Sequence, residues 1–342
     1  MTAPARPRST PEVAVWSWMR AYRTELLIFF VSFFALACFS GPRFLRQSAA
    51  PHFVYQAKAF LEGRLDVDPE VLPNIEDWAC VREVGVLRHR CTGPALSTDR
   101  WYVSFPAFPA VVMLPFVAIN GYQFNDTSFG VILGALAITL FYVMARSLVR
   151  RGELHRTEQD ALVLAGVLGF GTLLFSCAIR GEVWFLAEVM GVVLTCLYLQ
   201  AATGAARPVL AGVLWSMATL TRTPLVFTGL YFLLEALMPG PTGRPEQLRQ
   251  ALRTPRGWLR PVLLFAAGAA PLAILAMAFN VARFGSPGEF GHSFLYDNRV
   301  NADIDAHGLF SSVYLGRNLE AAFLMLPRVQ FSPFGIAYDP RG

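Results

Sequence analysis

The fold is decided by the stretch TSFGVILGALAITLFYVMARSL at residues 127–148, which is uncharged up to Arg146. A helix that crosses the hydrocarbon core of a bilayer needs about 20 predominantly apolar residues. The stretch is therefore predicted to be a membrane-spanning helix. The segment that follows it is basic, with Arg150, Arg151 and Arg156 added to Arg146. The positive-inside rule places such a segment in the cytoplasm.

The composition of the whole chain supports this interpretation. Hydrophobic residues make up 54% of the sequence and charged residues only 15%, and the mean hydropathy is positive. A soluble domain carries about 25% charged residues because its surface faces water. The modest excess of positive charge falls at the ends of apolar segments, so we attribute it to membrane topology and expect no binding to nucleic acid.

Further apolar segments bring the predicted number of crossings to about seven. They are residues 25–45, 161–179, 186–204, 208–221, 223–238 and 261–283. The last two segments before residue 240 are separated by Thr221-Arg222-Thr223-Pro224, where the proline favours a hinge. The basic residues before the first segment would also fit a signal peptide, but the many later spans favour an uncleaved anchor helix.

Residues 105–120 are apolar but are not predicted to cross. Pro106, Pro109 and Pro115 each lack a backbone donor, and lipid cannot replace the lost hydrogen bond. If this segment crossed, the basic segments 146–160 and 239–260 would both lie outside the cytoplasm, against the positive-inside rule. We therefore expect residues 105–120 to form a helix that lies on the membrane surface.

These observations define the predicted architecture, an all-α integral membrane protein of the bacterial cytoplasmic (inner) membrane. A cytoplasmic N-terminal segment covers residues 1–24, and the transmembrane module covers 25–283. The first extracytoplasmic loop, 46–126, carries interfacial helices near 52–62 and 105–120, and residues 284–342 form an extracytoplasmic segment. This segment ends in loop-like sequence, so either it rests on the membrane or the chain is a shortened form of a longer protein.

Two cysteines, Cys80 and Cys91, share the polar first loop. If that loop faces an oxidising compartment, the two thiols can form a disulfide. The alternative is a pair of free thiols.

No motif of a soluble enzyme is present in the sequence. There is no phosphate-binding glycine-rich loop, no nucleophile elbow and no HExxH, and the five histidines show no metal-ligand spacing. Any chemistry is therefore expected to come from polar residues at the extracytoplasmic membrane surface.

Three arginines depart from the positive-inside rule, because Arg180, Arg222 and Arg283 are each predicted at the extracytoplasmic end of a span. A guanidinium offers a fork of donors that matches the oxygens of a phosphate. If the three converge, they would bind the phosphate of a lipid headgroup. Alternatively, each one extends separately to the membrane surface.

Acidic side chains accompany these arginines in RGEVWFLAEVMG, residues 180–191. Glu182 is predicted at the membrane surface as a candidate catalytic group. Glu188 is predicted about one turn inside the bilayer, where a carboxylate needs a partner or a function. The alternative for both is an ion pair with a neighbouring arginine.

The first loop supplies the remaining candidates. His52 and Tyr55 lie at near-helical spacing, and Asp66 and Asp68 follow the predicted helix. A histidine or a carboxylate there is a candidate general base that would activate an acceptor hydroxyl, although two aspartates are also typical of a solvated turn. Tyr55 and Tyr102 are candidate substrate contacts.

The order of these elements resembles the C-type (GT-C) membrane glycosyltransferases, in particular the family-39-like branch of protein mannosyltransferases and aminoarabinose transferases. Four segments carry the resemblance, which covers roughly residues 20–300. They are YQAKAFLEG (55–63), the Pro-rich FPAFPAVVMLPF (105–116), LTRTP (220–224), which is similar to a Leu-Thr-Lys-Gly-Pro element, and FNVARFGSPGEFGHSFL (279–295).

The resemblance implies an enzyme that takes a sugar from a polyprenyl-phosphate carrier on the extracytoplasmic face. It also implies inversion at the anomeric carbon by direct displacement with a carboxylate as general base. A divalent metal is required in some branches of the family and not in others. The family's second acidic position corresponds to Glu182 or Glu188.

One departure concerns the catalytic aspartate that the family carries shortly after the first span. Here the window reads Ser48-Ala49-Ala50-Pro51-His52, without an acid. Either His52 acts as the base, or Asp66 or Asp68 does, or the chain is a non-catalytic relative that binds the lipid carrier. A transporter or flippase is a third alternative, which the absence of repeated halves disfavours.

The predicted topology can be tested by labelling with a membrane-impermeant maleimide in intact cells. We expect a cysteine introduced by Ser97→Cys, in the first loop, to react from outside. A cysteine introduced by His155→Cys should react only after permeabilisation, because residues 146–160 are predicted to be cytoplasmic. Labelling of His155→Cys in intact cells would overturn the assignment.

Overall fold

The computed structural model describes residues 22–73, 77–85, 87–238, 248–249, 251, 253–296, 302–308, 311–325, 328–332 and 335–339. This part of the chain is mostly helical. Four helices are long and apolar enough to cross a membrane, namely Arg23–Leu45, Asp126–Arg150, Val183–Ala205 and Pro255–Phe284. Two predicted segments lie partly outside the described residues. They are most of the N-terminal segment 1–24, and positions 239–247, 250 and 252 of the loop 239–260.

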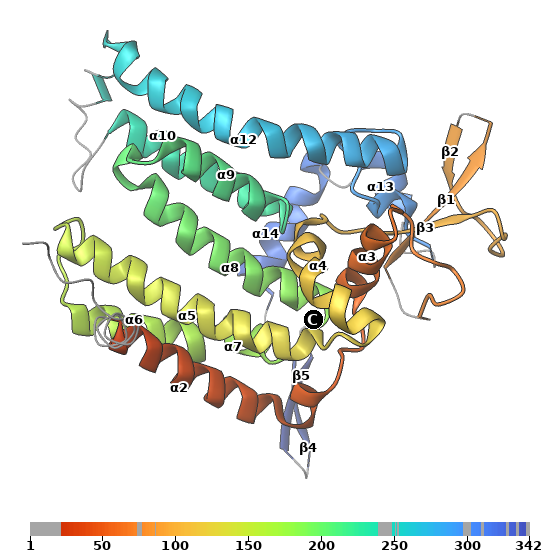
Figure 1. Cartoon of the computed structure of the whole chain (residues 1–342), viewed down its shortest axis with the longest axis horizontal. Helices are drawn as coiled ribbons and strands as arrows, with labels where there is room; N and C mark the ends of the chain where they lie inside the picture. The colour runs from red at the N-terminus through yellow and green to blue at the C-terminus, as the bar shows by residue number, and fades with distance from the viewer. Residues whose placement is uncertain are drawn as a thin grey trace, which may run out of the picture.

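The long helices form a row (Figure 1). Helix α2 (Arg23–Ser40) packs on α5 (Asp126–Arg150), α5 packs on α8 (Val183–Ala202), and α9 (Pro208–Thr219) lies between α8 and α12 (Pro255–Phe284). The 3-10 turn η1 (Gly41–Leu45) extends α2 toward the end of the bundle that carries a small β-sheet. We call this end the sheet end.

Two of the predicted spans are not single helices. Residues 161–179 divide into α6 (Glu158–Phe170) and α7 (Leu173–Ala178), because the Thr172 side chain accepts a hydrogen bond from the Leu174 amide and begins a new helix. Residues 223–238 begin as the 3-10 helix η4 (Thr223–Thr228) after Arg222 and continue as α10 (Gly229–Leu237). A 3-10 turn η3 (Thr203–Ala205) follows α8.

The segment between η1 and α5 contains helices close to the two predicted ones, α3 (His52–Leu61) and α4 (Phe108–Asn120), with the turn η2 (Gly121–Gln123). It also contains an antiparallel sheet in the order β2-β1-β3, formed by β1 (Trp78–Val84), β2 (Leu87–Arg90) and β3 (Arg100–Val103). The sequence predicted the two helices of this segment but not the sheet. Strand β1 is rich in the aromatic and β-branched residues that favour strands.

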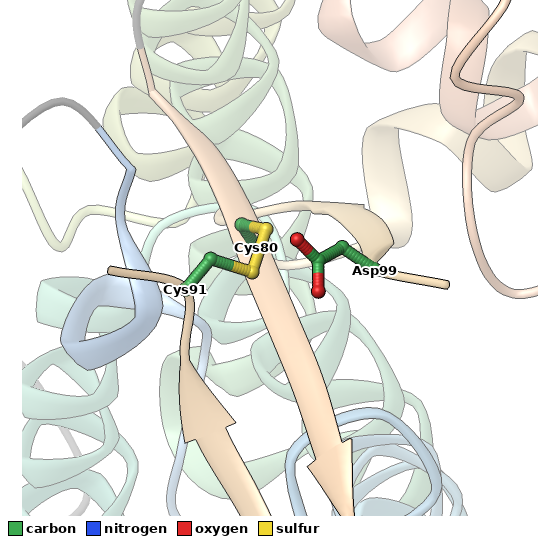
Figure 2. A group of neighbouring side chains, drawn as sticks. All are labelled: Cys80, Cys91 and Asp99. Atoms are coloured by element: carbon green, nitrogen blue, oxygen red, sulfur yellow. A yellow bond between two sulfur atoms is a disulfide. The ribbon is translucent and has the colours of Figure 1, made fainter. Parts of the chain in front are cut away.

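A disulfide joins Cys80 of β1 to Cys91 just after β2, as their shared polar loop predicted (Figure 2). Next to it, Arg82 donates Nε and Nη2 to the two oxygens of Asp99, at 2.8 and 2.7 Å. This bidentate ion pair holds the pKa of Asp99 below its usual value. The covalent link and the ion pair together fix the chain that connects β2 to β3.

After α12 the described chain forms short elements only. These are η5 (His292–Phe294), α13 (Ala302–His307), η6 (Ser312–Tyr314), α14 (Leu315–Phe323) and the antiparallel pair β4 (Arg328–Ser332) and β5 (Gly335–Asp339). The second sheet is a further departure from the all-α expectation.

Helices α9 and α12 approach each other closely because glycine lies at the contact on both sides. A Cβ atom on Gly212 would lie 2.0 Å from the Phe265 carbonyl oxygen, and one on Gly268 would lie 2.2 Å from the Val209 carbonyl oxygen. Small residues that permit such approach are common between membrane helices. This close contact between the two helices fixes where Leu220 and Arg222, which follow α9, lie relative to α12.

We expect Gly212→Ala to destabilise the fold by about 1–3 kcal/mol, because the added methyl group collides with a carbonyl that neither helix can move freely. The measurement is the thermal unfolding midpoint of the purified protein in detergent. Gly166→Ala on α6 is the matched control, since a Cβ atom there meets nothing within 4 Å. Equal midpoints for the two variants would show that the α9–α12 contact is not tight.

Candidate functional site

A cavity of about 700 Å³ opens beside α8 near the sheet end. We call it the α8 pocket. Most of its wall is apolar and comes from α6, α7 and α8, with Leu168, Leu173, Leu174 and Val192 among the lining residues. Its polar lining residues include Glu188 of α8 and Arg222, which follows α9. The pocket therefore combines an apolar wall with a small charged region.

Of the three arginines that the sequence singled out, Arg222 lines the pocket. Arg222 forms an ion pair with Glu188, and the Arg180 guanidinium lies 4.6 Å from the centre of the Phe185 ring, which lines the pocket. Arg180, Arg222 and Glu188 all lie within electrostatic range of the Cys177 thiol in the pocket wall. Arg180 is not among the residues that line the pocket, so the convergence of the arginines on one phosphate stays a prediction.

The third arginine, Arg283, lies elsewhere. Its side chain is buried in α12, donates to the Val103 carbonyl oxygen at 2.9 Å and to Asn280 Oδ1 at 3.0 Å, and lies over the Phe279 ring at 3.9 Å. It lines a separate apolar cavity of about 420 Å³ between α4, α9 and α12. Its contacts fasten β3 to the end of α12.

His52 begins α3 and is 0% exposed. Its ring lies 4.3 Å from that of Trp78, 6.0 Å from that of Phe105 and 6.3 Å from that of Trp184, measured between centroids. The sequence predicted a helix at this position, but it did not predict that the imidazole would be enclosed by aromatic rings.

Asp77 is a carboxylate that sequence reasoning missed. It is 6% exposed, and its Oδ2 accepts a hydrogen bond of 2.9 Å from Nε1 of Trp184, which lines the α8 pocket. Its carbonyl oxygen accepts from the Ser104 hydroxyl at 2.8 Å. Trp184 therefore connects the pocket to a buried acid.

The backbone at Asp77 is also unusual. Its φ of 72° makes it one of two non-glycine residues with positive φ among the described residues, the other being Ala205. Aspartate tolerates this conformation better than most residues, yet it still costs free energy, and such strain collects at functional sites. No local sequence pattern marks Asp77, because its partner Trp184 lies 107 residues away.

A second missed carboxylate, Asp126, lies beside the window that lacks the expected acid. As the first residue of α5, it accepts hydrogen bonds of 2.7 Å from both the amide and the hydroxyl of Ser48. Its side chain is buried, and Glu182 lies within electrostatic range. Because Ser48 donates to both of its oxygens, we interpret Asp126 as a structural residue that holds the first loop against the start of α5.

The other predicted acids lie in ordinary surroundings. Asp68 accepts from the Glu70 amide at 3.0 Å, as the alternative of a solvated turn predicts. Asp66 is half-buried and lies within electrostatic range of Tyr102. Glu182 is half-buried at the start of α8, and its Oε2 accepts from the Gly181 amide at 3.3 Å.

The two predicted tyrosines pack against other rings of the sheet end. The ring centroid of Tyr55 lies 4.8 Å from that of Tyr122. Tyr102 lies edge-on to Phe284, with 5.5 Å between the ring centroids. Burial raises the pKa of both Tyr55 and Tyr102. Neither is among the residues that line the α8 pocket.

Three potential metal-ligating side chains, Cys80, Cys91 and Asp99, lie together in the sheet (Figure 2). The disulfide occupies both sulfur atoms, and Arg82 occupies the carboxylate. These three side chains therefore serve the structure of the loop through the disulfide and the ion pair.

No family model, curated protein or solved structure matches this chain.

His292 belongs to the aromatic cluster around His52. Its ring lies 6.0 Å from that of Phe105, on which His52 also packs. Burial lowers the pKa of His292, with a smaller lowering from Arg222, while Glu289 and Asp77 act in the opposite direction. Asp77 and Arg222 are thus both within electrostatic range of one imidazole.

We expect this histidine to contribute to acid sensitivity. Above a pH of about 6.5, the usual histidine pKa, His292 is neutral in the folded and the unfolded chain. Below it the unfolded chain takes up the proton first, so stability falls as the pH falls toward the lowered folded pKa. His292→Gln should therefore flatten the decline of the unfolding midpoint between about pH 7 and 5.

The matched control for this measurement is His307→Gln, at an exposed position of α13. It should leave the slope of midpoint against pH unchanged. A slope that is the same in wild type and His292→Gln would show that His292 is not the group responsible.

Proposed function

We propose that the chain is a membrane glycosyltransferase that moves a sugar from a polyprenyl-phosphate carrier to an acceptor. In this proposal the chain crosses the bacterial cytoplasmic membrane about seven times, with the N-terminus in the cytoplasm and the sheet end outside. The alternating placement of the basic segments supports this topology. The resemblance to C-type glycosyltransferases in the order of sequence segments supports the activity.

The observation that carries the proposal is the α8 pocket. Its volume of about 700 Å³ is within the range of small-molecule sites, and its apolar wall suits a prenyl chain. At its charged region Arg222 can bind a phosphate, for which the guanidinium fork is well matched, and Arg180 lies beside Phe185 of the pocket wall. A phosphate would compete with Glu188 for Arg222.

Asp77 is the group that we assign as general base. In the proposed step its carboxylate takes the proton of the acceptor hydroxyl as the oxygen forms a bond to the anomeric carbon of the sugar. The bond from that carbon to the phosphate oxygen breaks, and the carrier phosphate leaves with the electron pair. Direct displacement inverts the configuration at this carbon. Trp184, which lines the pocket and donates to Asp77, supports this assignment.

The described pocket does not favour a metal ion. Among its lining residues the only carboxylate is that of Glu188, and Arg222 neutralises it. The proposed transfer step therefore uses no divalent cation.

The proposal predicts different defects for two variants. Asp77→Asn should still bind the carrier, since an amide oxygen can accept from Trp184, but should lose transfer by about 100-fold or more because the base is gone. Arg222→Ala should weaken carrier binding roughly tenfold or more, because a charged hydrogen bond is lost. The measurements are binding and single-turnover cleavage of a radiolabelled polyprenyl-phosphate sugar, with membrane extract as the acceptor source.

Glu70→Gln is the control, an exposed acid of the same loop. It should match wild type in both measurements. If Glu182→Gln abolishes transfer and Asp77→Asn does not, the base is Glu182. If Arg222→Ala binds the carrier as tightly as wild type, the α8 pocket is not the carrier site.

A second candidate function is lipid-carrier binding without catalysis. The acid missing between residues 48 and 52 and the low exposure of Asp77 behind Trp184 favour it. Intact carrier binding by wild type without any cleavage would select this alternative.

A further inference from the structure

Helix α14 (Leu315–Phe323) carries a stripe of exposed apolar side chains. Leu315, Leu319 and Phe323 follow one another at intervals of four residues, which places them on one face of a helix. Their exposed fractions are 58%, 48% and 79%. Val313 before the helix and Leu324 after it are also exposed, so the apolar face continues beyond both ends.

The opposite face of α14 is polar. Glu320 is exposed there, and Arg317 pairs with Asp303 at 3.7 Å and lies over the Tyr314 ring at 5.6 Å from its centre. A helix with one apolar and one charged face, and with little overall hydrophobicity, is typical of helices that lie in the plane of a membrane surface.

The direction of α14 agrees with such a position. In Figure 1 the helix runs crosswise to α8 and α12, whereas a further span would run along them. A helix crosswise to the spans is parallel to the membrane plane. In the view it is drawn behind the portion of the bundle nearer the sheet end.

We infer that α14 lies in the headgroup region of the extracytoplasmic leaflet, with Leu315, Leu319 and Phe323 inserted among the acyl chains. This inference rests on the membrane topology that forms part of the proposed function. It gives the segment after α12 a lipid surface as its partner and keeps that segment close to the sheet end.

A second copy of the chain is a poorer occupant for this face. A nine-residue helix is only about 14 Å long, whereas a stable interface buries about 800 Å² on each partner. The polar face carries Arg317 and Glu320, one charge of each sign, so the attraction to the membrane should come mainly from the apolar residues.

Spin labelling of the full chain tests the inference. The free cysteines Cys38, Cys177 and Cys196 are replaced by serine, and the disulfide is kept. Nitroxides are then attached through Leu319→Cys or Glu320→Cys in vesicles of phosphatidylcholine and phosphatidylglycerol. We expect the ratio of oxygen to nickel-chelate accessibility to be several-fold higher at position 319 than at 320, because oxygen concentrates in lipid and the chelate stays in water.

Ile274→Cys on an exposed face of α12 is the lipid-facing reference. High nickel accessibility at 319 and 320 alike, with position 274 in lipid, would overturn the inference but leave the membrane topology intact. A label at 319 that neither reagent reaches would indicate a protein contact, which also overturns it. If position 274 itself is in water, the membrane assignment fails, and the proposed function fails with it.

Discussion

The sheet end depends on a constraint that applies to every buried helix end, where polar groups have to find a partner within the protein. The first loop supplies these partners. Ser48 donates to Asp126 at the start of α5, and the Ala50 carbonyl oxygen accepts from the Val183 amide at the start of α8. Each bond connects the loop to a different long helix, so a shift of the loop would leave polar groups unpaired at both helix ends.

Hydropathy predicted the long helices well because their apolar residues are continuous. It located α5 to within a few residues, and Asn125 and the acidic Asp126 supply the start signals. The break at Thr172 was missed because a single hydroxyl decides it within an otherwise apolar run. The sheet was missed because β1 has four successive buried residues and not the alternation that predicts a strand. Its disulfide was predictable because both cysteines fall in one polar loop.

The candidate site was only partly predictable, for a related reason. Arg180 and Arg222 stood out because the topology predicted from the sequence places each of them at the extracytoplasmic end of a span. Asp77 gave no such signal, since its importance comes from burial and from a hydrogen bond to a tryptophan far along the chain. His52 fell in a correctly predicted helix, but its enclosure by rings depends on three separate segments of the chain.

The arginines differ in what surrounds them. This difference distinguishes an arginine suited to binding a ligand, Arg222, from one with a structural role, Arg283. Arg283 is buried, with a carbonyl oxygen, an amide oxygen and aromatic rings as partners, so replacing these contacts by a ligand would detach β3 from α12. Arg222 is paired with a carboxylate at the edge of a cavity, and an incoming phosphate can take the place of that carboxylate without leaving the guanidinium unpaired. An arginine whose partner a phosphate can replace is therefore better suited to an anionic lipid than Arg283, whose partners hold the fold together.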